Sequence, residues 1–236
     1  MPEPKLLAAR IDLPQKVAEA LPRLLSGEVP SDARVLKQGY VFLVDGFVIK
    51  FYPRTQKRFD WLRAPKALRA VRVHRRLLPV HSPDPVYWER VDRPEFDSLL
   101  VYEFVEGPTL LDLWKQEHQE SRDALPKLFA DLHATGVLLG DLHAKNLLWS
   151  DRGWCIIDLD GVRGGLHALR RRRITEIMWA RLLFDFEKSP EAEGLYCRYL
   201  ELAGQPWDAA ASWERVLEDY EAILKVHLAY GIQPGE

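Results

Sequence analysis

The chain has few cysteines, the residues that form disulfides and bind structural zinc. It holds only two cysteines, Cys155 and Cys197, each among apolar or aromatic neighbours, and it has no CxxC pair and no Cys/His ligand spacing. We therefore expect neither a zinc site nor a set of disulfides. Two reduced thiols are typical of a cytoplasmic protein.

Long apolar runs and a strong net charge are also missing. No uncharged apolar run approaches the roughly 20 residues that a membrane-spanning helix needs. The N-terminal sequence "MPEPKLLAARIDLPQ" lacks the apolar stretch of a signal peptide. A formal net charge of −2 gives no indication of a nucleic-acid partner, and 236 residues that are 47% hydrophobic suit a globular protein with one large domain or two small lobes.

The charge is nevertheless unevenly distributed along the chain. From Lys50 to Arg76 there are ten Lys and Arg residues and one acid, and residues 163–173 add five arginines and no acid. A basic region of this kind could face an anionic partner. A solvated helix face is the commoner explanation for a run of charge.

The first hundred residues predict a strand-rich region with one basic helix. Asp45-Gly46 separates two runs of β-branched and aromatic residues, which is a strong hairpin signal. The expected helices cover residues 14–25 and 66–78, and the expected strands cover 40–44, 47–52, 86–91 and 97–105.

The remainder of the chain is predominantly helical by its apolar periodicity, with one exception. In residues 137–158, the apolar runs "NLLW" and "CIIDLD" flank "SDRG", which predicts a small hairpin. The fold class is therefore α+β, a single two-lobed domain over 1–236 with a strand-rich lobe (1–104) and a helical lobe (105–236). The expected helices of the second lobe cover residues 109–118, 122–135, 167–187, 190–203 and 208–229.

The residues whose chemistry suggests a function lie around that hairpin. In "GDLHAKN", Asp141 and Asn146 are five positions apart, and Asp158 ends the second apolar run, so the hairpin would bring all three together. Carboxylate and carboxamide oxygens suit a hard cation such as Mg²⁺. Lys50, on a strand of the first lobe, could contact phosphates. The plainer alternatives are Asp and Asn side chains that cap turns and a lysine that is solvated on an edge strand.

These motifs together resemble the protein-kinase-like superfamily. "GDLHAKN" is similar to the corresponding loop of its bacterial small-molecule phosphotransferases, and "VYEFVEGPTL" precedes it as in that superfamily. "IIDLDGVR", followed by "LRRRRITEIMWARLL", most resembles the lipopolysaccharide core sugar kinases, the Kdo and heptose kinases. The resemblance covers Gly39 to Leu183 and implies the two-lobed protein-kinase-like fold.

The resemblance implies an ATP- and Mg²⁺-dependent phosphotransferase that acts on a sugar hydroxyl of the lipopolysaccharide inner core. Asp141 would be the catalytic base, and Asn146 and Asp158 would hold Mg²⁺. Lys50 would engage the α- and β-phosphates of ATP. Gly39 stands where a glycine-rich loop would cover the phosphates, and the hinge behind the adenine would be Tyr102, Glu103 and Phe104.

Further residues near the metal aspartate are candidates for acceptor binding. Guanidinium groups there would suit an acceptor that carries carboxylates or phosphates. Together with the basic helix they could also hold the protein at the cytoplasmic face of the anionic inner membrane. A loop hydrogen bond or a solvated helix start explains them equally well, and Asp160 is either a second metal ligand or a turn residue. The candidates are His143, Lys145, Arg163, Arg170, Arg171, Arg172 and Arg173.

Two departures from the family pattern leave alternatives open. Leu139 replaces the histidine that usually precedes the loop, and no acid occurs between Trp61 and Pro83, where a helix glutamate near Ala70 would normally hold the lysine. Asp60 or Asp84 could take that glutamate's place. The alternatives are a kinase of another small molecule or of protein Ser/Thr/Tyr, and a pseudokinase that binds or regulates without catalysis. The oligomeric state is not predicted.

Overall fold

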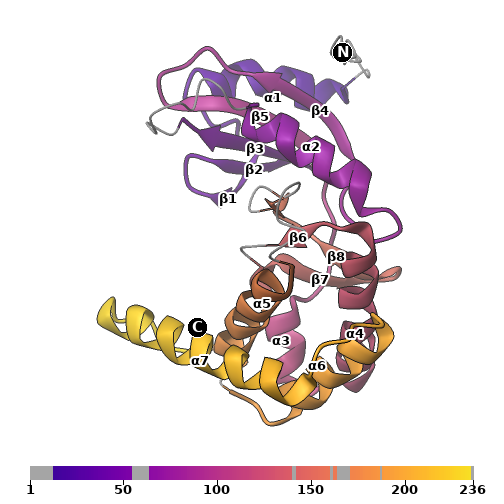
Figure 1. Cartoon of the computed structure of the whole chain (residues 1–236). Coiled ribbons are helices and arrows are strands. Elements are labelled where there is room, and N and C mark those ends of the chain that lie inside the picture. Colours follow the sequence, from indigo (N-terminus) through magenta and orange to yellow (C-terminus); the bar gives the residue numbers. More distant parts are fainter. Residues whose placement is uncertain are drawn as a thin grey trace. The chain divides into compact units, whose positions relative to one another are not determined.

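The computed structural model describes residues 13–54, 64–139, 142–159, 162–163, 171–186 and 188–234. The chain divides into two compact units (Figure 1). The N-terminal unit consists of Met1–His74 and Pro83–Phe104, and the C-terminal unit of Arg75–Ser82 and Val105–Glu236. Strands dominate the first unit and helices the second, so the α+β class that the sequence predicts is confirmed.

A five-stranded antiparallel sheet forms the framework of the N-terminal unit. Its strand order is β1-β2-β3-β5-β4. Asp45 and Gly46 join β2 to β3 with φ angles of 50° and 80°, the positive values that a two-residue type I′ turn requires, so the predicted hairpin is confirmed. The elements are α1 (Gln15–Leu25), β1 (Arg34–Lys37), β2 (Val41–Val44), β3 (Phe47–Pro53), α2 (Lys66–Leu77, whose last three residues belong to the C-terminal unit), β4 (Pro85–Arg90) and β5 (Phe96–Glu103).

Helix α1 packs its apolar face against one side of this sheet. Its buried residues are three or four positions apart and therefore share one side of the helix. They cluster with alternate strand residues such as Ile49 and Phe51 of β3. Because successive strand residues point to opposite faces, Lys50 projects from the other face of the sheet. The α1 residues in the cluster are Val17, Ala20, Leu21 and Leu24.

The described part of the C-terminal unit combines five α-helices and one 3₁₀ helix with short strand pairs. β7 and β8 form the hairpin that the sequence predicts, with Leu147 opposite Ile156 and Ser150 opposite Gly153. A second pair, β6 with β9, places Leu138 opposite Arg163. The elements are α3 (Leu110–Lys115), α4 (Gln119–Thr135), β6 (Leu138–Leu139), the 3₁₀ helix η2 (Ala144–Asn146), β7 (Leu147–Ser150), β8 (Gly153–Ile156), β9 (Val162–Arg163), α5 (Arg171–Asp185), α6 (Glu191–Leu202) and α7 (Ala209–Ala229).

Aromatic side chains fill the core of the helical unit. The ring of Trp179 on α5 lies 4.8 Å from that of Phe129 and 5.3 Å from that of Tyr196, joining α4, α5 and α6. α5 packs along α7, and α4 along α6. This core holds the middle of α5 against α4 and α6. None of the helices in the described part of the chain is long and apolar enough to cross a membrane.

Candidate functional site

The hairpin brings two of the predicted site residues to the same end. The backbone N–H of Ile157 donates to the carbonyl of Asn146 at 2.9 Å, one pair beyond the last ladder residues of β7 and β8. Asn146 therefore lies opposite the residue that precedes Asp158. Gly140 and Asp141, like Asp160, lie outside the described residues.

Asp158 has an unusual backbone conformation for a residue with a side chain. Its φ is 61°, in the left-handed region that costs most residues about 1–2 kcal/mol but that aspartate tolerates better than most. The residue is exposed, whereas the strand before it is buried. Strained backbone of this kind often occurs at binding and catalytic sites, so the conformation favours a functional role for Asp158.

Asp185, at the C-terminal end of α5, anchors the loop before η2 and was not predicted from the sequence. Its Oδ2 accepts a hydrogen bond of 2.6 Å from the backbone N–H of Ala144 and lies 3.9 Å from Nδ1 of His143. Burial raises the pKa of the Asp185 carboxyl, while the Ala144 hydrogen bond and the charges of His143, Lys145 and His227 oppose that shift. The loop is therefore fixed to the core helix.

We expect Asp185→Ala to destabilise the fold by about 1–3 kcal/mol, because it leaves the N–H of Ala144 without its acceptor. Asp185→Asn is the matched control, since a carboxamide oxygen still accepts that bond. Burial raises the pKa of the Asp185 carboxyl above its unfolded-state value, so the fold loses stability as pH rises from the unfolded-state pKa through the folded-state pKa. Asparagine does not ionise and avoids this loss. Urea unfolding at pH 7 measures both; equal losses in the two variants would contradict this account.

In the N-terminal unit, Lys50 lies on β3, where its ammonium group is 5.0 Å from the centre of the Tyr52 ring. Ala70, near the position expected for a helix glutamate, is buried at 2% exposure. Of the two acids considered as replacements, Asp84 lies 3.0 Å from Nε2 of His74. Asp60 lies outside the described residues.

The other predicted nucleotide contacts also lie in the N-terminal unit. Gly39 is in the exposed turn between β1 and β2 with a φ of 75°, a conformation that suits glycine. Exposed Glu103 ends β5, and the N–H of Phe104 donates to the carbonyl of Gly46 at 2.8 Å. The Arg34 guanidinium lies 5.7 Å from the centre of the Phe104 ring.

The arginines that begin α5 contact groups of their own unit. Nε of Arg172 lies 2.9 Å from Glu176, and Arg173 makes a two-pronged contact with Asp219 of α7. Arg171 lies near His133, whose pKa falls to about 4 mainly because the ring is buried and secondarily because of that positive charge. Arg163 is in β9, but its side chain, like Arg170 as a whole, lies outside the described residues.

Glu176 is the centre of this charged network. Its side chain is 2% exposed and accepts hydrogen bonds from Arg172, from Ser212 at 2.8 Å and from Arg215 at 2.9 Å. A buried carboxylate needs such partners to offset its lost hydration. The network joins α5 to α7, so Arg172 has a structural role in the C-terminal unit.

Comparisons with known proteins identify the family. A family model described as the lipopolysaccharide kinase (Kdo/WaaP) family matches residues 47–220. No curated protein matches the chain. Among solved structures, the GDP complex of aminoglycoside 2′-phosphotransferase-IIIa is similar at 13% identity and a TM-score of 0.59, with 88% of each chain covered.

Two further solved structures are similar to the chain. WaaP in complex with acyl carrier protein has 17% identity and a TM-score of 0.52, covering 85% of this chain and 95% of that one. WbdD has 14% identity and a TM-score of 0.50, covering 81% of this chain and 44% of its own. The chain thus spans less than half of WbdD, and at these identities the likenesses show the fold alone.

The family match is the stronger finding, because it covers more than half of the chain and runs from β3 into α7. It includes Lys50, the loop and hairpin from Asp141 to Asp158, and the arginines of α5. The similarity to the aminoglycoside phosphotransferase and WaaP structures agrees with it at the level of the fold. The chain therefore belongs to the lipopolysaccharide kinase (Kdo/WaaP) family.

Proposed function

We propose that this protein transfers the γ-phosphate of ATP to a sugar hydroxyl, on Kdo or heptose, of the lipopolysaccharide inner core. The observation that carries the proposal is the family match over residues 47–220. The position of Asn146 and Asp158 at one end of the β7–β8 hairpin supports it, because phosphate transfer needs oxygen ligands for a metal beside the catalytic loop.

In this proposal Asn146 and Asp158 hold Mg²⁺. Proteins usually bind Mg²⁺ through one or two carboxylates together with substrate phosphates, so a carboxylate and a carboxamide fit the ion. The phosphates of the nucleotide and water would complete the coordination of the ion. Bound Mg²⁺ would neutralise phosphate charge.

Groups of the protein itself would accept the proton and position the nucleotide. Asp141 would accept the proton of the attacking hydroxyl, and Asp185 would keep the loop in place through Ala144. Lys50 would contact the α- and β-phosphates, and the N–H groups of the turn at Gly39 would cover them. Glu103 and Phe104 would lie behind the adenine.

For the acceptor, we propose contacts from the loop and from the arginines near α5. Lys145 is exposed and His143 half-exposed, so both are available to a sugar. Arg171 and Arg173 are partly exposed at the start of α5, although Arg173 already contacts Asp219. Arg163 and Arg170 complete the proposed set, and Arg172 contributes through the fold.

ATP binding that depends on Mg²⁺ is the first test. Saturation at one hundred times Kd stabilises a protein by about 2.7 kcal/mol, which raises Tm by about 5–10 °C in a chain of this size. We expect such a shift with ATP and Mg²⁺, and a smaller one when Asp158 is replaced by asparagine. No shift in the wild type would contradict the proposal. If the protein consumed ATP with an aminoglycoside or a protein but not with core oligosaccharide, the proposed acceptor would be wrong.

We also propose that α2 holds the protein at an anionic membrane surface. Arg72, Arg75 and Arg76 are exposed on this helix, and Leu78, which follows it, is 74% exposed. Each arginine near such a surface contributes about 1 kcal/mol, so replacing all three by alanine should weaken binding to anionic vesicles about a hundredfold. Vesicle sedimentation measures this. Equal binding by this variant and by a control that loses Lys127, Lys188 and Arg198 would contradict the proposal.

A further inference from the structure

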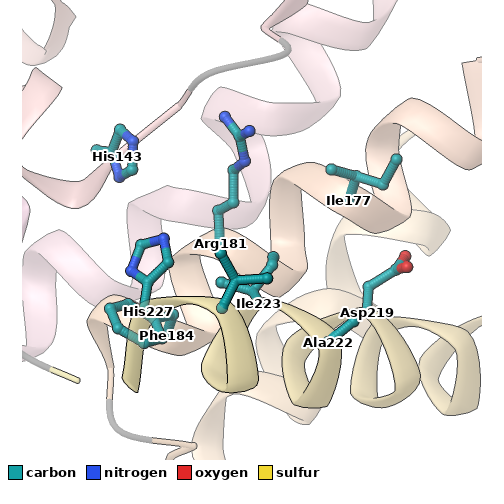
Figure 2. A pocket seen from close by; sticks show the side chains of 9 residues that line it. His143, Ile177, Arg181, Phe184, Asp219, Ala222, Ile223 and His227 are labelled. Atoms are coloured by element: carbon teal, nitrogen blue, oxygen red, sulfur yellow. The ribbon is translucent and has the colours of Figure 1, made fainter. Parts of the chain in front are cut away.

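The C-terminal unit contains a cavity of about 490 Å³ that none of the proposed nucleotide contacts line. Its volume lies within the range of small-molecule sites, about 300–1,000 Å³. It lies along α5 and α7 and reaches the loop at His143 (Figure 2). The residues that line it are His143, Ile177, Arg181, Phe184, Asp219, Ala222, Ile223, Val226 and His227.

The lining combines an apolar wall with basic side chains. Ile177, Phe184 and Ile223 provide carbon surface against which the C–H faces of a sugar ring could pack. The basic groups are His143, Arg181 and His227, and Figure 2 shows both imidazoles at the same side of the cavity. Such a lining favours a ligand with both an apolar surface and a negative charge.

The acids of the cavity region are already engaged. Asp219 holds Arg173, with a distance of 2.6 Å between Oδ1 and Nη2. Asp185 accepts the Ala144 hydrogen bond, and burial raises the pKa of its carboxyl. Nδ1 of His227 is buried and has no hydrogen-bond partner within the described residues. The cavity therefore presents the guanidinium of Arg181 and two imidazoles beside acids that have partners of their own.

The cavity is also close to the proposed catalytic base along the chain. His143, which lines the cavity, follows Asp141 by two positions in the sequence. Asp185 ties Ala144 to α5, the helix that carries Ile177 and Arg181. A group bound in the cavity would therefore reach the loop at His143.

From these observations we propose that the cavity is an acceptor subsite that binds the anionic group, carboxylate or phosphate, of a core sugar. Arg181 and His227 determine this specificity, and the apolar wall supports the sugar ring. A guanidinium group donates two parallel hydrogen bonds to either kind of anion. The inference rests on the proposed function, because it is the acceptor of that reaction that occupies the cavity.

The test uses delipidated core oligosaccharide as the probe and measures its binding calorimetrically without nucleotide. Losing a charge-assisted hydrogen bond costs about tenfold to a hundredfold in affinity, so Arg181→Gln and His227→Gln should each weaken binding by about that factor, while Arg181→Lys retains part of it. Ala222→Phe, at an exposed lining position, should block the cavity without changing its charge. Thermal unfolding confirms that each variant is folded.

Chemically modified probes identify the anionic group. Carboxyl-reduced and phosphate-free oligosaccharides are compared with the native one. The probe that lacks the recognised anion should bind weakly to the wild type, and Arg181→Gln should not weaken its binding further. Arg198→Gln is the control, because Arg198 is exposed on α6 and contacts only Asp123 among the interactions that the structure shows for it. The control should bind the native probe like the wild type.

The outcomes separate the subsite from the proposed function. If the wild type phosphorylates the oligosaccharide but Arg181→Gln, His227→Gln and Ala222→Phe leave its KM and affinity unchanged, the subsite is wrong and the function stands. If no phosphate is transferred but the native probe binds and the three variants weaken it, the subsite stands and the function fails. No binding of the native probe to the wild type overturns the subsite.

Discussion

Replacing Asp141 by asparagine should slow phosphate transfer by about 10²–10⁴-fold at saturating ATP and acceptor. In the proposed reaction this carboxylate accepts the proton of the attacking hydroxyl, and a carboxamide cannot do so. The affinity for ATP should change little, because Asp141 is not among the proposed nucleotide contacts. Single-turnover transfer from labelled ATP measures the chemical step, and the thermal shift with ATP measures binding.

Asp151→Asn is the matched control for this variant. Asp151 is an exposed carboxylate in the turn of the β7–β8 hairpin, ten residues along the chain from Asp141. It should transfer phosphate at the wild-type rate. Wild-type transfer by Asp141→Asn would show that another group accepts the proton, and equal losses in both variants would point to damage to the hairpin.

Replacing Glu176 by glutamine should destabilise the fold by about 1.5–3 kcal/mol, the usual worth of hydrogen bonds to a charged group, because the carboxylate is buried while its arginine partners are partly exposed. Arg172 and Arg215 would then lie beside each other without the carboxylate that both contact. Ser212 would lose a charged acceptor at the same point. The midpoint and slope of a urea unfolding curve give the loss in free energy.

An exposed ion pair provides the comparison. Asp123→Asn removes the partner of Arg198, and the two side chains are 53% and 55% exposed, so we expect a loss of at most about 1 kcal/mol. A loss of that size for Glu176→Gln would contradict the structural role of the network. It would also return Arg172 to the candidate residues for acceptor binding.

Features that depend on neighbouring residues were predicted well. Asp45-Gly46 predicted the β2–β3 hairpin, because few other residue pairs adopt two positive φ angles in succession. "SDRG" likewise predicted the β7–β8 hairpin, and with it the approach of Asn146 to the residue before Asp158. In both cases the chemistry of a short turn determines which residues face each other.

Some elements were missed or given the wrong start because the local sequence pattern did not indicate them. β1 (Arg34–Lys37) was missed because all four of its residues are exposed, so it has no apolar alternation. α4 begins at Gln119 rather than at residue 122, because the imidazole of His118 accepts the N–H of Ser121 and caps the first turn. Histidine is an uncommon cap, and its sequence pattern did not suggest one.

Contacts between residues far apart in the sequence could not be predicted. Asp185 binds Ala144, 41 positions earlier, and only the packing of α5 brings them together. The apolar run around Asp185 was a possible signal, since an acid inside such a run needs a partner when it is buried. Arg173 pairs with Asp219, 46 positions later, so the basic run alone could not show that its charges were engaged.

Transfer of labelled phosphate from ATP to delipidated inner-core oligosaccharide, with mass analysis of the product, tests the central claim most directly. We predict that the wild type adds phosphate to a Kdo or heptose hydroxyl only when Mg²⁺ is present, and that Asp141→Asn loses this activity. An oligosaccharide that gains no phosphate, from a protein that is folded and binds ATP with Mg²⁺, would contradict the account.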